Sequence, residues 1–188
     1  IEFVAVPMTL ADRVGAVHPL GERARNELAV VAPEPHGPPQ FVDAEEIAKH
    51  EFLERVVFVT AGSNAFASEL AGRNPGRLAC YAHHDPLLPD AAQRLERAVK
   101  EGGLSGYKIL GPKVDRRLDD RSLDPIWECA QSLGVPVLIH FGIMGGAGGV
   151  ASHTNISPLA IHDAAKRFPG LVVIVPHFGC GYLFETLN

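Results

Sequence analysis

Two histidines each end an apolar run. His140 ends residues 137–140 (VLIH), His177 ends residues 173–177 (VIVPH), and an aromatic residue and a glycine follow each histidine. Neutral imidazole is the commonest protein ligand of zinc and related ions, and it is the usual general base near neutral pH. The pair therefore predicts a metal-binding or proton-transferring site, against the alternative of two hydrogen-bonded core histidines.

Lys108 lies inside a third apolar run, residues 106–110 (GYKIL). A lysine in a buried strand must be paired, have a shifted pKa, or lie at the open end of the strand. Two functional roles are open, the binding of an anionic substrate group and carbamylation that bridges two metal ions. The structural alternative is a packed stem whose ammonium group reaches water.

Short runs rich in valine, isoleucine and leucine predict the strands that position these residues. They cover residues 55–59, 78–82, 106–110, 135–140 and 171–177. Helices are predicted at residues 43–53, 65–74, 91–100, 126–133 and 159–168. Near-continuous apolar strands that alternate with helices are typical of an α/β protein with a covered parallel sheet. Such a sheet is either doubly wound or closed as a (β/α)8 barrel of the TIM type.

The C-terminal ends of the strands line the site in parallel α/β folds. Side chains alternate along a strand, so His140 should point the same way as Leu138, and His177 the same way as Val173 and Val175. Neighbouring barrel strands would then place both imidazoles over one cavity.

Three segments in this order resemble the amidohydrolase-related family, which includes aminocarboxymuconate semialdehyde decarboxylase. They are residues 104–110 (LSGYKIL), 123–140 (LDPIWECAQSLGVPVLIH) and 168–179 (FPGLVVIVPHFG), and the resemblance covers roughly residues 41–188. It implies a distorted (β/α)8 barrel with a divalent metal, usually zinc. It also implies a hydrolase or decarboxylase that acts on a small carboxylated or cyclic substrate through a metal-bound water.

The resemblance assigns roles to three residues. His140 matches the metal ligand after the fifth barrel strand, and His177 matches the histidine after the sixth strand, which works on the metal-bound water or the substrate. Lys108 matches the position on the fourth strand that is carbamylated in some binuclear relatives. His177 and Lys108 are therefore the predicted catalytic residues.

The family pattern also contains an H-x-H pair after the first strand, and this sequence has no such pair. Glu34-Pro35-His36 takes the corresponding place, so Glu34 and His36 are candidate metal ligands beside His140. The alternative is an ordinary proline-rich loop. His83, after the strand at 78–82, and His153, after the glycine-rich residues 142–149, are candidate substrate contacts, against the alternative of solvated loops.

We expect a partial barrel domain at residues 27–188 and an N-terminal extension of undetermined role at residues 1–26. About six strands are predicted, the five above and the apolar run at residues 28–32 before Glu34, without the seventh and eighth strands and the aspartate that the family places after the eighth. An open barrel exposes strand edges and apolar core. Either further sequence exists, another chain completes the barrel, or the fold is reduced, and we expect a homo-oligomer.

Composition gives no reason to expect nucleic acid or a membrane as partner, and the family resemblance implies a small-molecule substrate. The net charge of −5 over 188 residues gives no reason to expect nucleic acid, and no apolar run approaches the ~20 residues of a membrane span. Three scattered cysteines favour reduced thiols and a cytoplasmic setting. Two alternatives stay open: a non-catalytic barrel relative that binds a ligand or partner protein, and a doubly wound protein with a cofactor at its switch point.

Overall fold

The structure is a computed structural model that describes residues 3–4, 28–29, 56–59, 63–142, 154–179 and 181–187. The predicted helix at residues 43–53 and the candidate residues Glu34, His36 and His153 lie outside the described residues. No helix within the described ranges is long and apolar enough to cross a bilayer.

Five parallel strands form one sheet in the order in which they occur in the chain. They are β3 (Val56–Val59), β4 (Leu78–His83), β5 (Gly106–Leu110), β6 (Val137–His140) and β7 (Val173–Ile174), and a separate parallel pair joins β1 (Phe3–Val4) to β2 (Leu28–Ala29). Each connection moves one strand further in the same direction, as in a barrel, whereas a doubly wound sheet reverses at a switch point. The described strands therefore contradict the doubly wound alternative.

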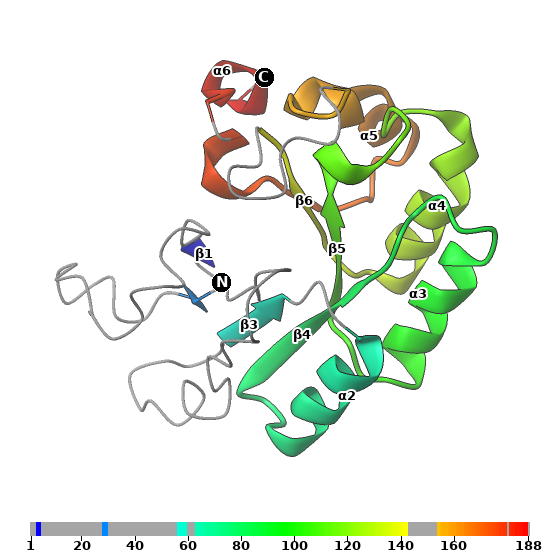
Figure 1. Cartoon of the computed structure of the whole chain (residues 1–188), viewed down its shortest axis with the longest axis vertical. Coiled ribbons are helices and arrows are strands. Elements are labelled where there is room, and N and C mark those ends of the chain that lie inside the picture. The colour runs from blue at the N-terminus through cyan, green and yellow to red at the C-terminus, as the bar shows by residue number, and fades with distance from the viewer. Residues whose placement is uncertain are drawn as a thin grey trace, which may run out of the picture.

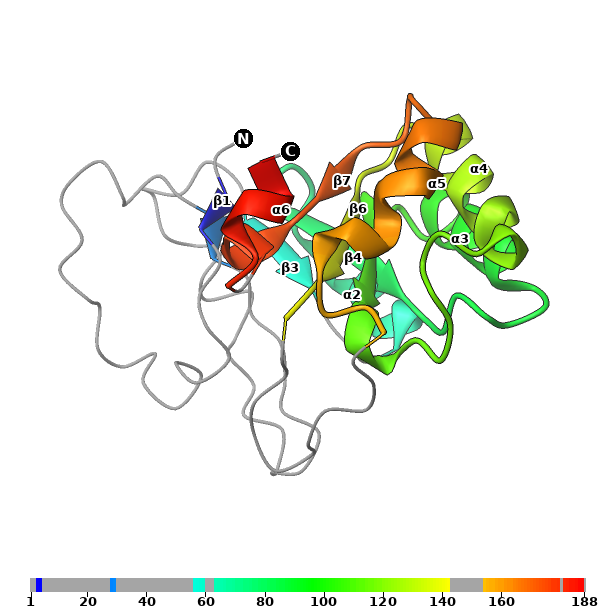
Figure 2. The same ribbon diagram turned by 90° about the horizontal axis from the view of Figure 1, so that it is seen from above.

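Helices cover one side of this sheet (Figures 1 and 2). They are α2 (Asn64–Arg73), α3 (Ala91–Lys100), α4 (Asp124–Leu133) and α5 (His162–Arg167), and a short α6 (Leu183–Leu187) follows β7. Local signals set their ends. The Ser63 hydroxyl accepts a hydrogen bond from the Ala65 amide at the start of α2, and Gly134 ends α4 with a φ of 65°.

Alternation along the strands separates two apolar clusters. Cys80, Ile109 and Ile139 belong to the large core beneath the helices. Tyr81 and Leu138 belong to a small cluster on the opposite face, which is the inner face of the barrel. Lys108 pairs in register with Leu138 and with His83, so the polar side chains at the strand ends belong to this inner face.

Two predicted elements differ from those observed. The predicted helix at 159–168 is a 3-10 turn, η5 (Pro158–Ile161), that continues into α5. Strand β7 ends at Ile174, three residues before His177, which lies in the 3-10 turn η6 (Pro176–Gly179). The second difference changes how His177 reaches the site.

Candidate active site

The structure brings His140 and His177 together. His140 is the last residue of β6 and is buried, and His177 is half-buried. Their ring centroids lie 5.4 Å apart with an interplanar angle of 73°. Two imidazoles at this spacing can act on one ion or one substrate.

His177 does not reach the site by strand alternation, so the expectation that it shares a face with Val173 and Val175 is wrong. Those two valines pack against the core beneath the helices, whereas Ile174 packs with the inner cluster. The chain turns after β7 because His177 and Phe178 adopt left-handed backbone angles, with φ of 57° and 49°. Each such non-glycine residue costs on the order of 1–3 kcal/mol and is typical of functional sites.

The ring of His140 offers an unused nitrogen. Its Nε2 atom is buried and has no hydrogen-bond partner among the described residues. Burial, with smaller contributions from the charges of Lys108 and His177, lowers the pKa of His140 to about 4. The imidazole is therefore neutral near pH 7. An unpaired polar atom costs about 1–3 kcal/mol, and a metal ion would remove that cost, so this ring fits a metal ligand.

Lys108 is 9% exposed and has no salt-bridge partner in the part of the chain that the structure describes. Most of the lysine side chain is therefore shielded from water, and no described carboxylate balances its charge. Burial lowers the pKa of Lys108 to about 7. Its charge also lowers the pKa of His83, His140 and His177, which indicates that the amine lies near all three imidazoles.

His83 is the last residue of β4, not part of a solvated loop. Its Nδ1 lies 3.0 Å from the carbonyl oxygen of Lys108. A carbonyl only accepts, so Nδ1 carries the ring proton and Nε2 is left as an acceptor in the neutral ring. Burial is the main cause of the lowered pKa of His83. His83 thus joins the site from the strand next to Lys108.

The described residues contain no group of three or more histidine, cysteine, aspartate or glutamate side chains arranged to hold a metal ion. Two buried imidazole nitrogens of the described residues have no hydrogen-bond partner, His84 Nδ1 and His140 Nε2, and that of His140 belongs to the ring beside His177. The proposed partners of His140, Glu34 and His36, lie outside the described residues, as does the proposed substrate contact His153.

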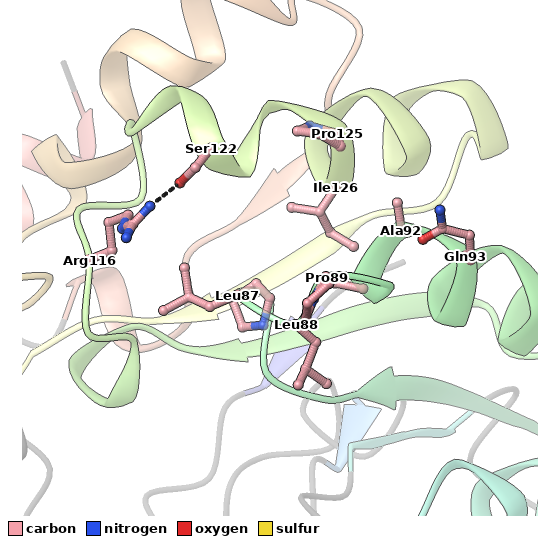
Figure 3. A pocket seen from close by; sticks show the side chains of 11 residues that line it. Leu87, Leu88, Pro89, Ala92, Gln93, Arg116, Ser122, Pro125 and Ile126 are labelled. Atoms are coloured by element: carbon pink, nitrogen blue, oxygen red, sulfur yellow. Dashed lines mark hydrogen bonds between the residues drawn. The ribbon is translucent and has the colours of Figure 1, made fainter.

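One cavity of the described region lies away from these residues. It measures about 360 Å³ and lies between the starts of α3 and α4, with walls that include Leu87, Leu88 and Ile126 (Figure 3). Arg116 at this cavity donates a hydrogen bond of 2.7 Å to the Ser122 hydroxyl. The histidines and Lys108 do not line it, and strand-end chemistry, rather than concavity, identifies the candidate site.

Gly111 packs directly behind His140. A β-carbon added to Gly111 would lie 2.8 Å from the carbonyl oxygen of His140 and 3.0 Å from that of Asn155. We expect Gly111→Ala to lower the free energy of unfolding by about 1–3 kcal/mol, because backbone must move to admit the methyl group.

Urea unfolding of the two variants tests this packing. Gly72→Ala is the matched control, because Gly72 lies in α2 and a β-carbon added there meets no atom within 4 Å. Alanine at this position should stabilise the helix by up to about 1 kcal/mol. Equal stability of Gly111→Ala and the parent protein would contradict the close approach.

Asn155 is a residue of this region that the sequence does not single out. It is fully buried and hydrogen-bonds to the loop after β5. Its partners lie 37–44 residues away in the chain, so no local pattern distinguishes it from a loop asparagine.

A parallel sheet wound in one direction, with histidines at its strand ends, defines a protein of the TIM-barrel class. Residues 16–184 match the model of the amidohydrolase family, and the chain belongs to this family. The chain is 28% identical to gamma-resorcylate decarboxylase from Polaromonas sp. over 145 residues, which are 63% of this chain and 44% of that protein. It therefore spans less than half the length of this curated relative.

Two solved structures share the fold. 2,6-Dihydroxybenzoate decarboxylase from Rhizobium aligns with a TM-score of 0.60 and 17% identity over 97% of this chain and 66% of that one. 5-Carboxyvanillate decarboxylase from Novosphingobium aromaticivorans aligns with a TM-score of 0.55 and 17% identity over 68% of this chain and 47% of that one. The latter structure contains manganese and 3-methoxy-4-hydroxy-5-nitrobenzoic acid. The family thus has relatives among metal-dependent decarboxylases of aromatic acids.

Proposed function

We propose that this chain provides part of the active site of a metal-dependent decarboxylase that acts on a small aromatic carboxylic acid. The observation that carries the proposal is the buried, unpartnered Nε2 of His140, beside His177 and the buried amine of Lys108. The similarity to gamma-resorcylate decarboxylase supports a decarboxylation over a hydrolysis. We further propose residues 27–188 as the barrel domain, with residues 1–26 as an extension.

In this proposal His140 holds a divalent ion through Nε2, and Glu34 and His36 complete the ligand set. Zinc and manganese are both compatible with imidazole and carboxylate ligands, and the Novosphingobium relative holds manganese. When bound, the ion supplies Lewis-acid polarisation of substrate oxygens.

Lys108 binds the substrate carboxylate. An anion beside the buried amine raises the pKa of Lys108 again, because opposite charges favour the charged forms. Substrate binding would therefore protonate the lysine and form a buried ion pair. His83 would accept a hydrogen bond from a ring hydroxyl through Nε2, and His153 remains a further proposed contact.

His177 handles the proton. Decarboxylation breaks the bond between the ring carbon and the carboxyl group, carbon dioxide leaves, and the electron pair on the ring carbon takes up a proton. Burial lowers the pKa of His177, so the ring is neutral near pH 7 and can first accept a proton from a substrate hydroxyl. It can then return that proton to the ring carbon as carbon dioxide departs.

Metal content and turnover test the proposal together. After reconstitution with manganese or zinc, elemental analysis of the full chain should give about one ion per chain. Carbon dioxide release from 2,6-dihydroxybenzoate or 5-carboxyvanillate should stop after chelation and return when metal is added. A panel of lactones and amides serves as the control for hydrolysis. Well under one ion per chain, or turnover that survives chelation, would favour the non-catalytic or metal-free alternatives.

A further inference from the structure

The side chain of Asn155 joins two loops at the candidate site. Its Nδ2 lies within hydrogen-bond distance of three carbonyl oxygens, those of Gly111 at 3.2 Å, Val114 at 3.2 Å and Arg116 at 2.7 Å, which share its two N–H groups. Its Oδ1 accepts from the Leu118 amide at 3.1 Å. One fully buried side chain thus binds both ends of residues 111–118, the loop that follows β5.

The chain next to Asn155 is bound to the end of β6. The carbonyl oxygen of Ile156 accepts a hydrogen bond of 2.6 Å from the Gly142 amide, two residues after His140. Gly111, which Asn155 holds, lies against the carbonyl oxygen of His140 with no room for a β-carbon. Asn155 therefore links the strand that carries Lys108 to the strand that carries His140.

The amide can have only one orientation here. Exchanging its oxygen and nitrogen would point the oxygen at three carbonyl oxygens and the nitrogen at an N–H group. Aspartate has nearly the same size and shape, but its carboxylate cannot donate to those carbonyls. The donor, rather than the volume, is therefore what position 155 requires.

We infer that Asn155 is a positioning residue, which holds the loop after β5 against the end of β6, beyond Leu110 and His140, the last pair of residues in register between the two strands. The inference rests on the proposed function, since the placement of His140 at this strand end matters where metal and substrate carboxylate are held together. Residues that support metal ligands typically contribute about 10–100-fold to metal affinity or activity, and catalytic geometry must be held to roughly 0.5 Å.

Asn155→Ala and Asn155→Asp test the inference against Leu95→Ala. Leu95 is fully buried in α3, and its truncation should destabilise the fold away from the site, as loss of a buried leucine side chain generally does. The measurements are made at a temperature where circular dichroism shows every variant folded. We expect the manganese affinity of both Asn155 variants to be lower by about 10-fold or more, and their kcat to fall. Leu95→Ala should retain the manganese affinity and the kcat of the parent protein.

A second measurement needs neither metal nor turnover. The T-shaped contact of His140 and His177 makes their ring-proton chemical shifts sensitive to small displacements. At one fixed pH, metal-free Asn155→Ala should shift these signals, whereas Leu95→Ala should not. If the parent protein lacks turnover but the signals shift, the proposed function fails and the positioning role stands. Unchanged signals and manganese affinity in folded Asn155→Asp would overturn the inference.

Discussion

Replacement of His140 by alanine should reduce kcat/KM of the metal-loaded protein on the order of 10³-fold or more. The loss should exceed the roughly 10–100-fold typical of residues that only support a ligand, because His140 is itself a proposed ligand. A ligand that binds the folded state and not the unfolded chain raises stability. Manganese should therefore raise the Tm of the parent protein and leave the Tm of His140→Ala almost unchanged. Steady-state kinetics and thermal unfolding with and without manganese measure both effects.

His162→Ala is the matched control for this histidine. His162 lies in α5 with its side chain 50% exposed beside Asp163, so its removal should leave turnover and the metal-induced rise in Tm intact. His140→Ala protein that keeps turnover and still gains stability from manganese would show that the ion, if bound, is held elsewhere.

The part of this site that the sequence predicts lies on regular strands. The sequence predicts a strand at residues 106–110 and a helix at residues 91–100, and the structure contains both. A polar residue within or at the end of an apolar strand stands out in a parallel sheet, which is why Lys108 and His140 can be singled out. The solvated-loop alternative for His83 is wrong because β4 extends one residue beyond the predicted strand.

The sequence predicts that His177 lies beside His140, but not how His177 gets there, and it does not predict the contacts of Asn155. His177 enters the site through left-handed residues that are not glycine, and local propensity does not favour that conformation. Asn155 acts through hydrogen bonds to a loop far away in the chain. Both features arise where tertiary structure overrides local preference, and such sites are expected to be functional ones.

Replacement of Lys108 by methionine should stabilise the metal-free protein near pH 7. The pKa of Lys108 is about 7 in the folded protein, against an ordinary value of 10.5. Between these values the unfolded chain holds a proton that the folded chain lacks, so the stability of the parent protein rises with pH. Every tenfold loss of proton affinity on folding costs about 1.4 kcal/mol, so Lys108→Met should gain several kcal/mol at pH 7. The gain should shrink as the pH approaches the ordinary pKa of lysine.

Urea unfolding at about pH 7 and about pH 10 measures this gain, since these values lie near the two ends of the window. Lys100→Met is the control, because Lys100 is 62% exposed beside Glu96 and should change stability by no more than about 0.5 kcal/mol at either pH. A gain for Lys108→Met that is the same at both values would contradict a buried neutral amine.

The same substitution should impair the enzyme that it stabilises. Loss of one partner of a buried ion pair costs about 2–5 kcal/mol of binding, so kcat/KM for a carboxylated substrate should fall about 100-fold or more. A lysine that lowers stability in the empty site and recovers its charge on meeting a carboxylate is a trade of stability for recognition. Lys108→Met protein that is more stable yet decarboxylates normally would remove the lysine from the binding of substrate.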